Sequence, residues 1–161
     1  MTAGEQLRSL LAEIGPVLDL AEVYEAPGGR TWTLTVQDGA TLFVDLMPDD
    51  SRLWLSAEVG TPKAKNRIQL YTLVLQYNAQ WQQTGGIRLA LDSPDGAIIL
   101  AYDMPVAGLD MPGLCTVIRN FCDMRDGWQR IVADDSSDRQ ASGSADGPMP
   151  PDNQGTRMIR V

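Results

Sequence analysis

Residues 66–83 read NRIQLYTLVLQYNAQWQQ, and this stretch decides how the chain is organised. At 100° per residue it predicts a helix with two apolar sectors, which lie ~140° apart. The first sector holds Leu70, Leu73, Val74, Tyr77 and Trp81, and the second holds Ile68, Tyr71, Leu75 and Ala79. A surface helix of a single domain needs one apolar stripe for its own core. The other sector therefore predicts that a second molecule, most simply another copy of the chain, covers this helix.

Strand patterns precede and follow this helix. Apolar and polar residues alternate over residues 31–36, 41–47 and 53–59, with turn residues between the three segments. After a Thr-Gly-Gly turn that ends the helix, residues 87–91 and 98–102 alternate in the same way. Alternation bounded by turn residues is typical of antiparallel hairpins. The sequence therefore predicts five antiparallel strands.

Two more helices are predicted at the ends of the strand pattern. The first runs from about Thr2 to Ile14, where aliphatic side chains share one face and a Gly-Pro pair ends the helix. The stretch that follows, as far as residue 29, reads as irregular. Asp110 is placed to cap a third helix that runs to about Ala133. The predicted fold is α+β, a five-stranded antiparallel sheet with three helices in the order α-β-β-β-α-β-β-α.

The length of 161 residues suits one domain followed by a tail. Residues 1–133 form the predicted domain. Residues 134–161 form an acidic tail with almost no apolar side chain before Gln154, so we expect it to be largely disordered. Its last five residues, 157–161, read RMIRV and are apolar and basic. That composition favours docking on a sheet edge or a partner, and a frayed terminus is the alternative.

Charge and hydropathy narrow the class of partner. The formal net charge is −8 and the sequence pI is about 4.4. Such a field repels the phosphates of nucleic acids and anionic lipids. No run of about 18 apolar residues is present to cross a bilayer, and the first residues lack the apolar block of a signal peptide. We therefore expect a cytoplasmic protein that binds neither nucleic acid nor membrane, with basic or weakly charged polypeptides as partners.

Residue types that support catalysis are scarce in this chain. Histidine is absent, which removes the commonest general base and metal ligand. Acidic residues pair at 49–50, 92 with 95, and 134–135, but there they suit turns or the tail, where aspartate bonds the backbone. Cys115 and Cys122 would lie ~10 Å apart on one helix, beyond the ~7 Å limit for a disulfide. We expect no catalytic residue, no metal site and no cofactor.

The strand pattern also places apolar side chains on the face of the sheet that the helices leave open. If Leu42 and Leu53 point toward the helices, the pleat turns Phe43 and Trp54 to the opposite face, together with Ile99. Isolated exposed aromatic residues need no function, and a reversed assignment of the two faces is a further alternative. Alternatively, they form a groove for an extended peptide beside a free sheet edge, which supplies main-chain hydrogen bonds. The sequence leaves these interpretations open.

The order of the elements, in an acidic chain of this length, resembles the type III secretion chaperones of the Tir-chaperone family, class I. Residues 75–86, LQYNAQWQQTGG, look like the end of the family's second helix, with its Asn, Trp and Thr-Gly-Gly before the fourth strand. Residues 52–60, RLWLSAEVG, and 105–110, PVAGLD, look like its third strand and its entry to helix three. The resemblance covers about residues 3–133 and leaves the tail mostly outside.

This resemblance implies a bacterial homodimer associated with virulence that works without catalysis or ATP. Each protomer would capture an extended N-terminal segment of a secreted effector protein and keep it soluble and ready for export. Components of the secretion apparatus are a further class of partner. Carried onto this chain, the dimer contacts are Leu70, Leu73, Val74, Tyr77 and Trp81. The candidate effector contacts are Leu7, Leu11, Trp32, Phe43 and Trp54.

Two other functions compete with this one. A protein of the same fold could sequester another secretion component and so control secretion gene expression, using the same binding surface. From a different class, the chain could be a small enzyme with a carboxylate site. Capture of effectors by the intact surface distinguishes a binding protein from an enzyme, whereas the sequence does not separate the chaperone from the regulator.

Overall fold

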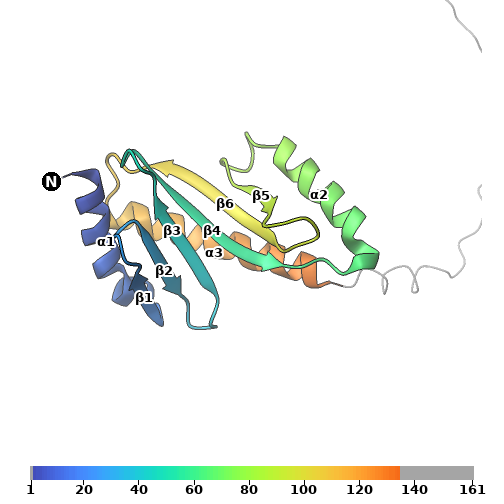
Figure 1. Ribbon diagram of the computed structural model, residues 1–161, viewed down its shortest axis with the longest axis horizontal. Coiled ribbons are helices and arrows are strands. Elements are labelled where there is room, and N and C mark those ends of the chain that lie inside the picture. The colour runs from blue at the N-terminus through green and yellow to red at the C-terminus, as the bar shows by residue number, and fades with distance from the viewer. Residues whose placement is uncertain (1, 135–161) are drawn as a thin grey trace, which may run out of the picture.

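The computed structural model describes residues 2–134 as one sheet with three α-helices (Figure 1). The helices are α1 (Ala3–Leu18), α2 (Arg67–Ala79) and α3 (Met111–Ala133), and a 3-10 turn, η1 (Ala64–Asn66), precedes α2. The strands are β1 (Glu22–Glu25), β2 (Thr31–Thr35), β3 (Thr41–Leu46), β4 (Arg52–Gly60), β5 (Arg88–Leu91) and β6 (Ile98–Pro105). Apart from Asp134, the predicted tail lies outside the described residues.

The six strands form a single antiparallel sheet in the order β1-β2-β3-β4-β6-β5. Helices α1 and α3 contact each other, and α3 runs along one face of the sheet across β4 (Figure 1). Helix α2 lies apart from that layer, beside the edge strand β5. The predicted α+β class and the three helices are therefore confirmed, while the prediction of five strands is wrong.

One face of the sheet supplies the core, as the alternation predicted. Trp32, Val44 and Leu55 are paired across β2, β3 and β4, and all three are buried. Side chains of α1 and α3 cover this face, including Leu11 and Ile118. Burial of such residues contributes roughly 1.5–3 kcal/mol each, so this face holds the layers together. The opposite face, which carries Phe43 and Trp54, has none of the three helices packed over it.

The sixth strand is β1, which the sequence suggested to be irregular. Its four residues, EVYE, show no buried side chain, so the period-two hydrophobic signal of a strand is missing. Pairing with β2 alone creates the strand, from Glu22 opposite Thr35 to Glu25 opposite Trp32. A short, charged edge strand of this kind is a common way to limit edge-to-edge aggregation.

Helix α1 starts as predicted but ends later. Thr2 and Glu5 form a capping box, in which the Thr2 hydroxyl accepts from the Glu5 backbone and the Glu5 carboxylate accepts from the Thr2 backbone. The predicted end at Ile14 is wrong, because the helix continues through Pro16 to Leu18. Proline removes one hydrogen bond, to the carbonyl of Ala12, and both residues are exposed, so water can hydrate that carbonyl.

Helix α3 spans the predicted residues and forms the second layer. Asp110 caps it by accepting from the Gly113 backbone at 2.8 Å. Near its other end the buried guanidinium of Arg125 pairs with Asp126 and, at 3.2 Å, with Asp38 in the β2–β3 turn. Burial lowers the pKa of Arg125, but the hydrogen bond and charge of Asp126 and the charge of Asp38 outweigh it and raise the pKa. This charged group therefore fixes the hairpin to α3.

None of the helices within residues 2–134 has the length and apolarity needed to cross a bilayer.

Candidate partner-binding surfaces

Helix α2 is shorter than the predicted 66–83, because it covers Arg67–Ala79 and turns occupy residues 80–86. Part of its first apolar sector, Leu70, Val74 and Tyr77, faces its own protomer. Leu70 and Val74 are buried there, with 8% and 9% of their surface exposed. Leu70 and Val74, which the sequence predicted to contact a partner subunit, are thus buried within the protomer, and Val74 belongs to its hydrophobic core.

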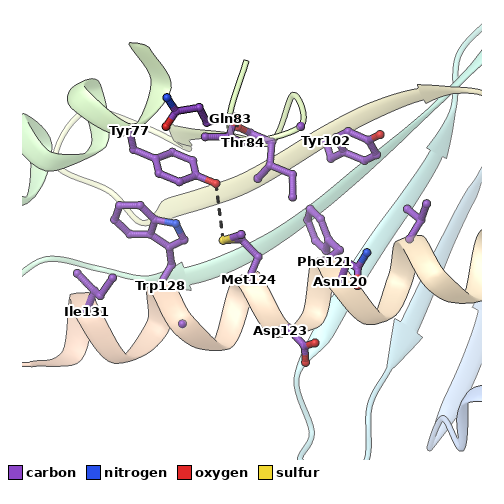
Figure 2. Close-up of a pocket in the computed structure, with 14 residues that line it drawn as sticks. Tyr77, Gln83, Thr84, Tyr102, Asn120, Phe121, Asp123, Met124, Trp128 and Ile131 are labelled. Carbon is purple, nitrogen blue, oxygen red and sulfur yellow. Dashed lines mark hydrogen bonds between the residues drawn. The ribbon is translucent and has the colours of Figure 1, made fainter. Parts of the chain in front are cut away.

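Tyr77 continues this inward sector and contacts α3. Its ring meets that of Trp128 edge-on, with centroids 5.0 Å apart, and its hydroxyl lies 3.6 Å from the Met124 sulfur (Figure 2). Burial raises the pKa of the Tyr77 hydroxyl. Tyr77, a predicted dimer contact, therefore anchors α2 to α3 within one protomer.

Most of the second apolar sector of α2 is open to solvent, whereas its Tyr71 is half-buried and packs against the core. Ile68 and Leu75 are 82% and 69% exposed, the largest exposed fractions among the large hydrophobic residues of the described chain. With Thr72 and Ala79 they follow the spacing i, i+4, i+7, i+11, so the four lie in one stripe along the helix. The predicted contacts Leu73 and Trp81 are exposed as well, at 40% and 64%. One apolar face of α2, centred on Ile68 and Leu75, is therefore left uncovered by the protomer itself.

Helix α2 also closes the β5 edge of the sheet. The Asn78 side chain accepts from the Leu89 backbone N–H and donates to the Leu89 carbonyl, both at 2.9 Å. One turn further, the Thr84 hydroxyl donates to the Ile87 carbonyl at 3.1 Å. These bonds take the place of a neighbouring strand, so the β5 edge is not free at these positions. At the other side of the sheet, β1 has β2 as its one described strand neighbour.

Replacement of Asn78 by alanine is expected to lower the free energy of unfolding by about 2 kcal/mol, because two hydrogen bonds are lost beside the buried Leu89. Urea unfolding, followed by tryptophan fluorescence, measures the change. Gln76→Ala, at an exposed position of the same helix, is the matched control and should change the stability by less than about 0.5 kcal/mol. Equal stability of the two variants would contradict this account of the β5 edge.

The uncovered face of the sheet carries a group of aromatic side chains. Tyr24 and Phe43 are 51% and 43% exposed. Both are register partners of Thr33 on β2, Tyr24 from β1 on one side and Phe43 from β3 on the other. Phe43 is paired with Ser56, two residues from Trp54 on β4, so Phe43 and Trp54 are diagonal neighbours. The half-buried Trp54 has the Arg88 guanidinium 5.2 Å from its ring centroid. We call Tyr24, Phe43 and Trp54 the outer aromatic group.

Three of the predicted effector contacts lie on the other side of the sheet. Leu7 and Leu11 on α1 have no exposed surface, and Trp32 on β2 has 2%. Trp32 shares its face with Leu34, as the alternation of β2 requires. These side chains serve the core, which corrects the expectation that they are available to an effector. Tyr24 joins the group instead, and the sequence missed it because β1 was not predicted.

The predicted turn aspartates have structural roles. Asp49 accepts from the Ser51 hydroxyl at 2.7 Å and its backbone at 3.1 Å, and these bonds lower the pKa of Asp49. Asp50 and Asp95 pair with Arg30 and Arg67, at 2.9 and 2.8 Å. Within residues 2–134, no three His, Cys, Asp or Glu residues form a group that could hold a metal ion.

The two cysteines are free thiols. Cys115 is buried and Cys122 half-buried, and burial raises the pKa of the Cys122 thiol. A raised pKa leaves less of the reactive thiolate at neutral pH. This agrees with the interpretation of both residues as small side chains of an apolar helix.

The sheet, the helices on one face of it and α2 at its edge define the class of fold as that of the secretion chaperones. The chain belongs to the Tir chaperone protein (CesT) family, whose model matches residues 9–129. Type III secretion chaperones of this family are thus the relatives that the sequence suggested. Among curated proteins, none matches the chain.

Solved structures agree with this fold. A chain of the ExsC–ExsE complex is similar with a TM-score of 0.68 and 19% identity, over 82% of this chain and 97% of that one. A chain of the HopA1–SchA chaperone–effector complex gives 0.62 and 17%, over 79% and 95%. A chain of the complex between the Yersinia pestis type III secretion chaperone SycH and a fragment of YscM2 gives 0.55 and 22%, over 73% and 95%.

Proposed function

We propose that the protein is a cytoplasmic, dimeric chaperone that binds extended segments of secreted effector proteins without catalysis. It keeps them soluble and delivers them to a bacterial type III secretion system. The observation that carries this proposal is the uncovered sheet face with its outer aromatic group, in a chain of the Tir chaperone family. Complexes of similar fold that contain a chaperone and an effector support it.

The outer aromatic group suits an extended polypeptide. A strand presents alternate side chains to one face, at a spacing of ~6.6 Å, which is close to the ~7–8 Å between diagonal neighbours in a sheet. Phe43 and Trp54 have this diagonal relation. Tyr24, the third member of the group, lies on the edge strand β1, whose outer backbone groups offer main-chain hydrogen bonds to a client segment.

Charge favours the same kind of client. The net charge of −8 attracts basic or weakly charged segments and holds loaded complexes apart in solution. Near the outer aromatic group, Asp103 is already paired with Arg52 and Arg88. On this face a client therefore meets aromatic rings, threonine and serine side chains and the paired charge of Asp103. It also meets two carboxylates, those of Asp45, which accepts from the Thr31 hydroxyl, and of the exposed Glu58, and these suit a basic client segment.

Dimerisation is proposed to use the exposed stripe of α2. Two copies related by a two-fold axis would bring the same surface together from both sides. Residues 68–87 contain no acidic or basic side chain, so two protomers that each carry a charge of −8 can approach there with little local repulsion. Burial of Ile68 and Leu75 from both copies, at ~1.5–3 kcal/mol each, is of the order of the ~4–15 kcal/mol that association costs.

The proposal is tested by secretion. A tagged copy of the chain recovers its partners from the cytosol of its host, and each recovered polypeptide is then followed in the culture supernatant after the chaperone gene is deleted. We expect at least one recovered polypeptide to disappear from the supernatant and to accumulate as aggregates or fragments in the cell. Unchanged secretion of every recovered polypeptide would overturn the proposed function.

A further inference from the structure

A groove that the proposed function does not use lies between α3, the turn after α2 and β6. Its volume is about 840 Å³. Figure 2 shows Phe121, Met124, Trp128 and Ile131 along α3, with Thr84 across from them. The groove is on the side of α3 that faces α2, away from the outer aromatic group.

The groove is apolar and has room for side chains. Phe121 and Trp128 are buried and form its floor, whereas Ile131 is 42% exposed and lies at the end nearest the C-terminus of α3. Gly127 lines the groove, and a Cβ placed at Gly127 would have no atom within 4 Å. A glycine in the middle of a helix costs ~0.5–1 kcal/mol relative to alanine. Here it leaves space that aliphatic side chains of a ligand can fill.

The sequence offers an occupant for this space, residues 157–161, which read RMIRV. Met158, Ile159 and Val161 are the apolar side chains that follow a stretch almost without them, and methionine adapts well to irregular apolar grooves. Arg157 and Arg160 flank them with positive charge. Residues 2–134 carry an excess of acidic over basic residues, and Asp123 stands at the rim of the groove. Residues 157–161 therefore match the groove in size, polarity and charge.

The segment between α3 and residues 157–161 is long enough for these residues to reach the groove. Helix α3 ends at Ala133, two residues beyond Ile131, so the chain leaves the helix at one end of the groove. From there to Val117, the most distant α3 residue in the groove, the helix measures ~25 Å at 1.5 Å per residue. Residues 135–156 span up to ~70 Å when fully extended. A segment tethered this closely has a millimolar effective concentration at the groove.

We propose that residues 157–161 dock in the groove between α2 and α3 of their own protomer, with Met158 and Ile159 against Trp128 and the space above Gly127. The tail then fills an apolar groove of about 840 Å³ that would otherwise face water. This inference depends on the groove and the tail, and on neither the client nor the secretion system.

Trypsin cleavage of the full chain tests the proposal. The tail contains one cleavage site inside the proposed docked segment and a second site outside it, which serves as the internal reference. Cleavage after Arg157 requires the docked segment to leave the groove, whereas cleavage after Arg139 does not. Rates at both sites are divided by those of a synthetic peptide of residues 135–161, which removes the intrinsic preference of the enzyme. We expect cleavage after Arg157 to be slowed about tenfold or more relative to Arg139, since cleavage follows the population of the open form.

Two groove variants and dilution complete the test. Gly127→Phe fills the groove and should restore fast cleavage after Arg157, whereas Gly127→Ala, the control for helix propensity, should keep the protection. Circular dichroism verifies that both variants are folded. Equal normalised rates at the two arginines, or protection that Gly127→Phe leaves intact, would overturn the proposal. Loss of protection on about a hundredfold dilution would also overturn it, because the occupant would then come from a second copy.

Discussion

The double variant Ile68→Glu, Leu75→Glu is expected to be a folded monomer under conditions where the native chain is a dimer. Both side chains are more than two-thirds exposed in the single chain, so the substitutions remove little from its own core. In a two-fold interface the same substitutions remove four apolar side chains and place four like charges in the contact. We expect the dimer to be weakened by at least about 3 kcal/mol, or more than a hundredfold in Kd. Light scattering coupled to size-exclusion chromatography measures the mass.

Gln69→Glu, Gln76→Glu is the matched control for this experiment. It adds the same two charges to the same helix, but both positions lie ~80–120° around the helix from Ile68 and Leu75. Its mass should remain that of the native protein. A native chain that is already monomeric at micromolar concentration would refute dimerisation. Equal dissociation of both variants would show that net charge, and not the stripe, controls the assembly.

The sequence predicted the two-sided character of α2 but not which side faces outward. Periodicity locates Leu70 and Val74 in one sector and Ile68 and Leu75 in the other, with similar side chains in both. Tertiary contacts decide between the two sectors: the Tyr77 ring meets the Trp128 ring edge-on, and the Asn78 side chain bonds the backbone of Leu89. Such contacts join elements far apart in the chain, so no local pattern reveals them.

For the strands, too, the sequence predicts the features that a local pattern determines and misses those that depend on contacts with other elements. Alternation placed Leu42 and Val44 on the covered face and Phe43 on the open one, because the pleat leaves no other choice once one face is buried. Local pattern does not reveal strand β1, because Val23 is its single side chain that packs against the core and the strand depends on pairing with β2. Trp32 was read both as part of the buried alternation and as an effector contact, and its burial decides for the core.

The sequence predicts the helix ends that a capping residue determines. It does not predict those that packing against other elements determines. Asp110 forms the predicted cap of α3, and Thr2 and Glu5 cap α1 at the start that the sequence predicted. Pro16 would end a helix on local grounds, yet α1 continues because Leu18 packs against the core while the lost hydrogen bond faces water. Trp81, by contrast, falls outside α2 because the turns of residues 80–86 replace its last predicted turn.

The double variant Phe43→Asp, Trp54→Asp is expected to abolish the capture of client segments while the protein remains folded and dimeric. Buried aromatic contacts at protein interfaces commonly contribute 2 kcal/mol or more each when truncated. Loss of two should therefore weaken binding by about 4 kcal/mol, roughly a thousandfold. Pull-down of an effector recovered with the native chain, followed by titration calorimetry, measures the loss.

Trp54→Asp places a carboxylate opposite Asp45 and Asp103, which could disturb the sheet, so Phe43→Asp, Trp54→Thr is tested beside it. Threonine removes the ring and suits a strand. Gln76→Asp with Gln129→Asp adds two charges at exposed positions on α2 and α3 and should leave capture unchanged. Capture that survives both sheet variants would refute the outer aromatic group as the client surface. Capture lost by the control as well would mean that the overall charge drives binding, because a contact surface is sensitive to position and a long-range field is not.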